Sequence, residues 1–136
     1  MKIRLNENQS KIFANVFNKE MYMRDDCPRE IAFWGGYGSG KSFISIIIAY
    51  YLCSQHKDVQ LLMTRFSYRQ LKDTCIVQFK DAFPPEEYGY YHSKSDNEFH
   101  FKNNSRIIFR SFDDPRKILS SSFDAVIMCQ AEELKE

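Results

Sequence analysis

The hydrophobic residues of the chain follow two patterns that alternate along it. Short continuous apolar runs bounded by turn residues are typical of buried strands. Three strands of this kind are predicted, at residues 31–34, 59–64 and 125–129. Apolar residues at helical spacing predict helices around them, from residue 6 to a break at 24–28, over 42–56, over 67–83 and from residue 130 onward.

The pattern of hydrophobic and polar positions changes after Pro84 and Pro85. Residues 98–102 alternate between polar and apolar positions, which predicts a strand with Phe99 and Phe101 on one face. Asn103 and Asn104 come next, and asparagine tolerates the left-handed backbone of tight turns. Residues 106–112 predict a second strand, so the segment is expected to form a β-hairpin.

The order of elements predicts an α/β fold. Strands that alternate with helices are typical of a three-layer arrangement, with a mostly parallel sheet and helices on both faces. The hairpin is then an insertion. In helix 67–83 the core-facing residues are expected to be Leu71, Cys75, Val77 and Phe79. No repeat or linker divides the 136 residues, so we expect a single domain.

Composition narrows the class of protein. Apolar residues make up 43% of the chain and charged residues 27%, as in soluble globular proteins. The net charge is +1, so no basic excess by itself indicates nucleic-acid binding. The aromatic share of 15% is interpreted as core filling. The chain opens without an apolar signal segment, and its longest apolar run is too short for a bilayer, so we expect a cytoplasmic protein without a membrane partner.

The four cysteines have no CxxC spacing, which favours reduced core thiols. The three histidines have no ligand spacing with cysteines or carboxylates, so a metal site built by protein side chains alone is not expected.

A glycine-rich segment joins the first predicted strand to the helix that follows, and it fits the pattern G-x-x-x-x-G-K-[ST]: Gly35-Gly36-Tyr37-Gly38-Ser39-Gly40-Lys41-Ser42. The glycines allow positive φ and a close approach of the backbone to a ligand, so that consecutive N–H groups form an anion-binding nest. The next helix adds its positive N-terminal end. Lys41 is expected to bridge the β- and γ-phosphates of ATP, and the Ser42 hydroxyl to ligate Mg²⁺.

Hydrolysis also needs a carboxylate after a buried strand. The expected strand 125–129 is followed by Gln130, Glu132 and Glu133 instead of an adjacent Asp-Glu pair. Gln130 could orient a water molecule, and either glutamate could serve as the acid. The same glutamates could equally be solvated residues in the first turn of a helix. Asp124 lies at the other end of the strand and is interpreted as a strand-entry residue.

Two further residues have two readings each. Arg65 directly follows the second predicted strand, where parallel sheets bind ligands. It is expected either to sense the γ-phosphate, in its own subunit or a neighbour's, or to be a plain surface arginine. Gln9 is expected either to contact an adenine base through its amide or to cap the first helix.

The chain resembles the N-terminal ATPase domain of the large terminase subunit, the DNA-packaging motor of tailed bacteriophages. The similar segments, in order, are Leu5-Asn6-Glu7-Asn8-Gln9 (adenine-binding segment), the loop Gly35–Ser42 (Walker A), Met63-Thr64-Arg65 with Gln70-Leu71-Lys72-Asp73, the hairpin Phe101–Phe109, Asp113–Lys117, and Phe123–Val126 before Walker B. Two differences are that the family often has arginine at the position of Tyr37, and an Asp-Glu pair where this chain has Cys129 and Gln130.

The resemblance implies a P-loop fold and a motor that couples Mg-ATP hydrolysis to DNA translocation. Its implied partners are double-stranded DNA, the portal protein, the small terminase subunit and further copies in a ring, in the host cell cytoplasm. Residues 1–136 would form one partial ATPase domain, without the family's nuclease domain. The degenerate Walker B keeps a second reading open, a non-catalytic nucleotide-binding remnant. A helicase-like ATPase fits less well, because helicases usually keep the Asp-Glu pair.

Overall fold

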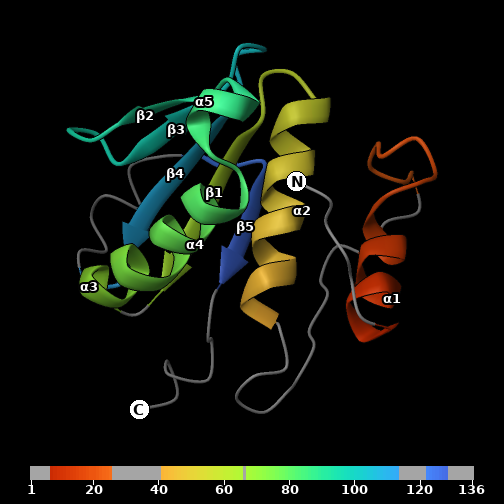
Figure 1. Ribbon diagram of the computed structural model, residues 1–136, viewed down its shortest axis with the longest axis horizontal. Coiled ribbons are helices and arrows are strands. Elements are labelled where there is room, and N and C mark those ends of the chain that lie inside the picture. Colours follow the sequence, from red (N-terminus) through yellow and green to blue (C-terminus); the bar gives the residue numbers. More distant parts are fainter. Residues whose placement is uncertain (1–6, 26–40, 66, 114–121, 129–136) are drawn as a thin grey trace.

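The computed structural model describes residues 7–25, 41–65, 67–113 and 122–128. Their elements, in chain order, are α1 (Glu7–Val16), α2 (Lys41–Gln55), β1 (Gln60–Arg65), α3 (Tyr68–Gln70), the π-helix η1 (Leu71–Ile76), α4 (Val77–Ala82), α5 (Pro85–Tyr88), β2 (Tyr91–Ser93), β3 (Glu98–His100), β4 (Arg106–Ser111) and β5 (Ala125–Met128). Helices and strands interleave, so the predicted α/β class is confirmed (Figure 1). The strand predicted at 31–34 and the helix from residue 130 lie outside the described residues.

The described strands form one sheet in the order β2-β3-β4-β1-β5. Strand β1 lies between β4 and β5 and runs parallel to both, so that Met63 lies between Phe109 and Ile127. The β2–β3 and β3–β4 pairs are antiparallel. Within the described part, the sheet is therefore mixed, not mostly parallel as predicted. The cause is the hairpin, which extends the sheet edge together with β2, a strand that the sequence pattern did not reveal.

The main core cluster lies on one face of this sheet, and Leu62 and Ile108 are buried on the other. Leu61 and Met63 of β1, Ile107 and Phe109 of β4, and Phe99 of β3 all point to the face of the main cluster and pack with residues of α2, η1 and α4. The described helices that join this core cluster therefore cover a single face, whereas helices on both faces were predicted. On the opposite face of β5, Val126 and Met128 are 53% and 45% exposed, so this strand alternates where a fully buried one was expected.

Aromatic rings fill the core under the hairpin, which confirms their interpretation. Tyr50 of α2 stacks on Phe83 with ring centroids 4.1 Å apart. Phe79 of α4 lies 5.0 Å from Phe99 of β3, again between centroids. The Tyr90 hydroxyl donates to the Phe83 carbonyl at 2.6 Å, so its polar end is satisfied inside the cluster. These rings fasten the hairpin to the helices.

The segment predicted as one helix over 67–83 contains a π-helix. Ser67 caps its start, because the Ser67 side chain accepts a hydrogen bond from the Gln70 amide at 3.2 Å. Leu71, Cys75 and Phe79 are buried as expected, but Val77 is 46% exposed and the prediction for it was wrong. Ile76 is buried instead. The residues four and five positions after Leu71, Cys75 and Ile76, face the core, whereas Val77 at the sixth position is turned toward solvent.

The sequence also predicted where the first helix ends and which residue precedes the last strand. The first helix ends at Val16, before the predicted break, and a bridge between Phe17 and Met23 closes the turn that follows. Asp124 is a strand-entry residue as predicted, since its carboxylate accepts from the Gln60 amide at 2.8 Å.

Two cysteines, Cys53 and Cys75, are buried free thiols as expected, and the other two lie outside the described part. No helix in the described ranges combines the length and apolar character that a membrane crossing needs.

Candidate functional site

The start of α2 and the end of β1, which the sequence analysis connected with phosphate binding, lie at the same edge of the sheet. Strands β1, β4 and β5 are parallel, so their carboxyl ends lie at the same edge. Helix α2 leads into β1 through residues 56–59 and runs in the opposite direction, which brings the start of α2 to that edge (Figure 1). Ligands of parallel α/β sheets bind outside the carboxyl ends of the strands. We call this region the carboxyl edge.

Helix α2 begins at Lys41, the lysine of the glycine-rich pattern. Its first turn contains no acidic residue, so nothing in that turn neutralises the positive end of the helix dipole. This arrangement favours an anion at the helix start. The glycine-rich residues up to Gly40 lie outside the described residues, as do the side chains of Lys41 and Ser42. The predicted helix after the loop is confirmed, and the roles of these residues remain predictions.

Arg65 ends β1 at the carboxyl edge and is buried, with 8% of its surface exposed. Its side chain points to the core face, where Nη1 donates to the Thr74 hydroxyl of η1 at 2.6 Å. The Arg65 carbonyl accepts from the Phe112 amide at 3.1 Å. Arg65 is thus held by two segments and is not an exposed surface arginine. Its predicted role toward a γ-phosphate remains a prediction.

The other predicted site residues fall where the structure gives no side chain. Gln130, Glu132 and Glu133 lie outside the described residues, beyond the end of β5. Gln9 lies in α1, where its side chain is not described. Across residues 7–25, 41–65, 67–113 and 122–128, no group of three or more His, Cys, Asp or Glu side chains could hold a metal ion.

The structure adds a carboxylate that the sequence analysis named only as the start of the segment Asp113–Lys117. Asp113 follows β4 at the carboxyl edge and accepts hydrogen bonds from the Ser111 hydroxyl and, at 3.3 Å, from the Tyr68 amide. It therefore links the end of β4 to the start of α3. An acid directly after a predicted strand was the available signal. Thr74 was also missed, because a threonine inside a predicted helix carries no functional signal by itself.

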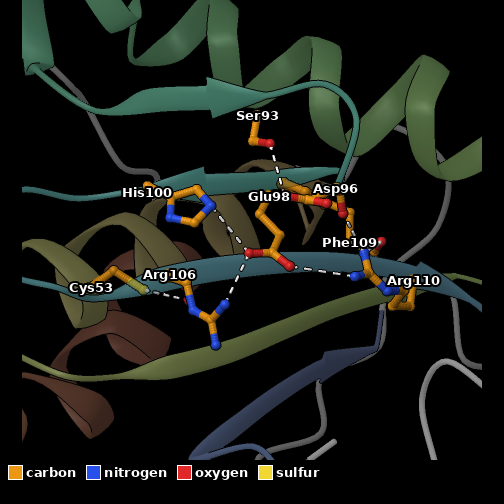
Figure 2. Close-up of polar contacts among 8 residues, drawn as sticks. All are labelled: Cys53, Ser93, Asp96, Glu98, His100, Arg106, Phe109 and Arg110. Carbon is orange, nitrogen blue, oxygen red and sulfur yellow. Dashed lines mark hydrogen bonds and ion pairs between the residues drawn. The ribbon is translucent and has the colours of Figure 1, made fainter. Parts of the chain in front are cut away.

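A second polar cluster lies away from this edge, on the face of the hairpin opposite the core (Figure 2). Three side chains surround the Glu98 carboxylate. Its Oε1 lies 3.1 Å from Arg106 Nη1 and 3.2 Å from His100 Nε2, and its Oε2 lies 3.4 Å from Arg110 Nη2. The Glu98 side chain is only 10% exposed, so these donors compensate for its lost hydration. Glu98 and His100 belong to β3, whereas Arg106 and Arg110 belong to β4, so the cluster joins the paired strands of the hairpin.

A comparison with curated protein sequences gives no match. A profile described as phage terminase large subunit matches residues 29–136, which is well over half of the chain. The matched range begins before the glycine-rich loop and includes every described element from α2 to β5. The chain therefore belongs to the phage terminase large subunit family.

Proposed function

We propose that this chain binds and hydrolyses Mg-ATP as the ATPase module of a phage DNA-packaging motor. The observation that carries the proposal is the position of the glycine-rich pattern. In a member of the terminase large subunit family, this pattern leads directly into α2, whose start lies at the carboxyl edge of the sheet. The pattern, the helix and the edge are the three parts that a phosphate-binding loop requires.

The proposed roles follow from the chemistry of each residue. Backbone N–H groups from Gly35 to Gly40 would surround the phosphates, and Lys41 would bridge the β- and γ-phosphates as a point charge. The Ser42 hydroxyl would ligate Mg²⁺, which neutralises phosphate charge when bound. Arg65 would contact the γ-phosphate, and Gln9 the adenine.

The acid is proposed to come from the segment after β5. Glu132 or Glu133 would accept the proton of the attacking water, and Gln130 would orient that water, since an amide cannot act as a base near neutral pH. What supports this proposal is that β5 is parallel to β1, so that β5 ends at the same edge as Arg65.

The described residues fit an anionic ligand at this edge. The first turn of α2 has no acid that would repel phosphate, and Arg65 contributes a cation at the end of the neighbouring β1. The proposed partners are double-stranded DNA, the portal protein, the small terminase subunit and further copies of the chain in a ring, in the host cytoplasm. Family membership supports DNA and packaging partners in general.

One observation favours a second candidate, a nucleotide-binding module without turnover. Cys129 and Gln130 follow β5 where the family usually has an Asp-Glu pair, and neither a thiol nor an amide replaces the carboxylate that takes the proton. The two candidates share ATP binding and differ only in hydrolysis.

Equilibrium binding of a fluorescent ATP analogue tests the shared part. The unmodified chain should bind the analogue in the presence of Mg²⁺, and excess ATP should displace it. Lys41→Ala should weaken binding by at least about tenfold, the loss expected for a buried charge-assisted contact. Lys57→Ala, which removes an exposed lysine beyond the other end of α2, is the matched control and should bind normally. Equal binding by both variants would refute the proposed site.

A further inference from the structure

A hydrogen-bonded chain connects Arg65 to the π-helix. Arg65 Nη1 donates to Thr74 Oγ1 at 2.6 Å, and Thr74 Oγ1 lies 2.5 Å from the Gln70 carbonyl oxygen. A hydroxyl has one hydrogen, and a carbonyl can only accept, so the Thr74 hydrogen goes to Gln70. The lone pairs of Thr74 Oγ1 are then left to accept from Arg65. The polarity of the chain is fixed by chemistry.

The irregular helix provides the place for this hydroxyl. The Val77 amide bonds to the Lys72 carbonyl, five residues back, where an α-helix would use four. A threonine hydroxyl that bonds to the carbonyl four residues earlier tends to bend a helix. The contact from Thr74 to Gln70 is of that kind, and it joins the π-helix to the last residue of α3. Single π-helical turns are frequent at functional sites.

We propose that Thr74 is a positioning residue for Arg65 in ATP hydrolysis; this inference rests on the function proposed above. The guanidinium is a planar fork whose N–H directions are fixed relative to one another. The short bond from Nη1 to Thr74 therefore fixes the direction of one N–H and restricts the orientation of the whole group. Because Arg65 is buried at the carboxyl edge, this orientation affects how the guanidinium meets a transferring phosphoryl group.

The burial of Arg65 and Thr74 separates this role from an incidental surface contact. Arg65 is 8% exposed, and Thr74 is half-buried between the buried residues Leu71 and Cys75. The contact is shielded from water, so water replaces it poorly when it is removed. Thr74 itself is not placed against the nucleotide, and it acts only through Arg65.

Thr74→Val and Thr74→Ser make the decisive pair of variants in the full chain. Valine keeps the shape and removes the acceptor, whereas serine keeps the hydroxyl. For Thr74→Val we expect kcat to fall roughly tenfold with KM changed less than about twofold, the signature of an interaction that matters in the transition state. Thr74→Ser should restore most of kcat. Equal loss in both variants, or no loss in Thr74→Val, would overturn the positioning role.

If the chain turns over ATP slowly, the same variants are compared by their binding of MgADP with and without aluminium fluoride. The complex of MgADP with aluminium fluoride mimics the transferring phosphoryl group, so the fluoride should increase the affinity for MgADP. In Thr74→Val this increase should be about tenfold smaller than in the unmodified chain. Lys41→Ala separates the proposed ATPase function from the positioning role of Thr74. If neither turnover nor binding depends on Lys41, the proposed function fails and this inference with it. If they depend on Lys41 but not on Thr74, only the positioning role is wrong.

Discussion

The side-chain amide of Asn103 donates hydrogen bonds to the carbonyl oxygens of Cys53 at 2.8 Å and of His56 at 3.1 Å. Asn103 lies in the hairpin turn, and both acceptors lie at the C-terminal end of α2. The Ser105 hydroxyl adds a bond to the His56 carbonyl at 2.5 Å. The hairpin turn thus satisfies carbonyls that the end of a helix leaves without partners. The far end of the helix that begins at the carboxyl edge is fixed by the hairpin.

The first prediction concerns this cap. Asn103→Ala should lower the free energy of unfolding by about 1–3 kcal/mol, because the carbonyls of Cys53 and His56 lose a part-buried bond from the Asn103 amide. Asn104→Gly is the matched control and should change it by less than about 0.5 kcal/mol. Asn104 has a φ of 71°, which glycine adopts without strain, and this offsets the lost contact with Asp58. Urea unfolding of the three proteins measures both values. Equal stability of Asn103→Ala and the unmodified chain would show that the turn does not hold α2.

The second prediction concerns Glu98. Glu98→Gln keeps the size of the side chain but leaves Arg106 and Arg110 without their shared carboxylate. We expect a loss of about 1–3 kcal/mol in unfolding free energy, as for other charge-assisted bonds that are largely shielded from water. Glu87→Gln on the exposed side of α5 should have almost no effect. If both variants unfold at the same urea concentration, the cluster does not stabilise the hairpin.

The third prediction concerns pH. Burial lowers the pKa of His92 below its usual value of 6.5, and the nearby Lys80 and Lys94 lower it further. Lys80 Nζ lies 3.4 Å from His92 Nδ1, so this nitrogen accepts and the neutral ring is favoured. The folded state therefore binds the proton less tightly than the unfolded state. The stability that His92 contributes is complete above pH 6.5 and is lost as the pH falls through the lowered pKa.

Thermal unfolding from about pH 7.5 to about pH 5 measures this effect. His92→Gln should reduce the acid-dependent fall of the melting temperature. An unchanged pH dependence in His92→Gln would assign the acid sensitivity to other groups.

The fourth prediction concerns Cys53. Burial raises the pKa of its thiol to about 12, so the reactive thiolate is scarce at neutral pH. Alkylation followed by peptide mass spectrometry should label Cys53 at least about tenfold more slowly in the folded chain than in urea. Rapid labelling of Cys53 in the folded chain would mean that α2 does not remain packed on the sheet.

Local sequence patterns predicted much of the fold. The strand over Gln60–Arg65, the helix over Lys41–Gln55 and the Asn103–Asn104 turn were each found within a residue or two of their predicted positions. In these segments the apolar spacing and the turn chemistry agree with the tertiary structure. The family was also identified from the order of the motifs, and the profile match confirms it.

The missed features depend on contacts distant in sequence. Nothing in the sequence near Leu71–Ile76 distinguishes a π-helix from an α-helix, because the difference is one residue in hydrogen-bond spacing. Strand β2 has three residues and takes its pairing from β3, so its own pattern was too short to detect. The relation of Arg65 to Thr74 joins two elements across a strand end, and no spacing rule reports it.

Mg-ATP turnover by the purified chain, with Lys41→Ala beside it, tests the central claim most directly. The account predicts turnover in the unmodified chain and its loss, with that of ATP binding, in the variant. Lys57→Ala should turn over ATP at the normal rate. Binding without turnover would support the nucleotide-holding module and contradict hydrolysis by this chain. Turnover that persists in Lys41→Ala would contradict the proposed phosphate site itself.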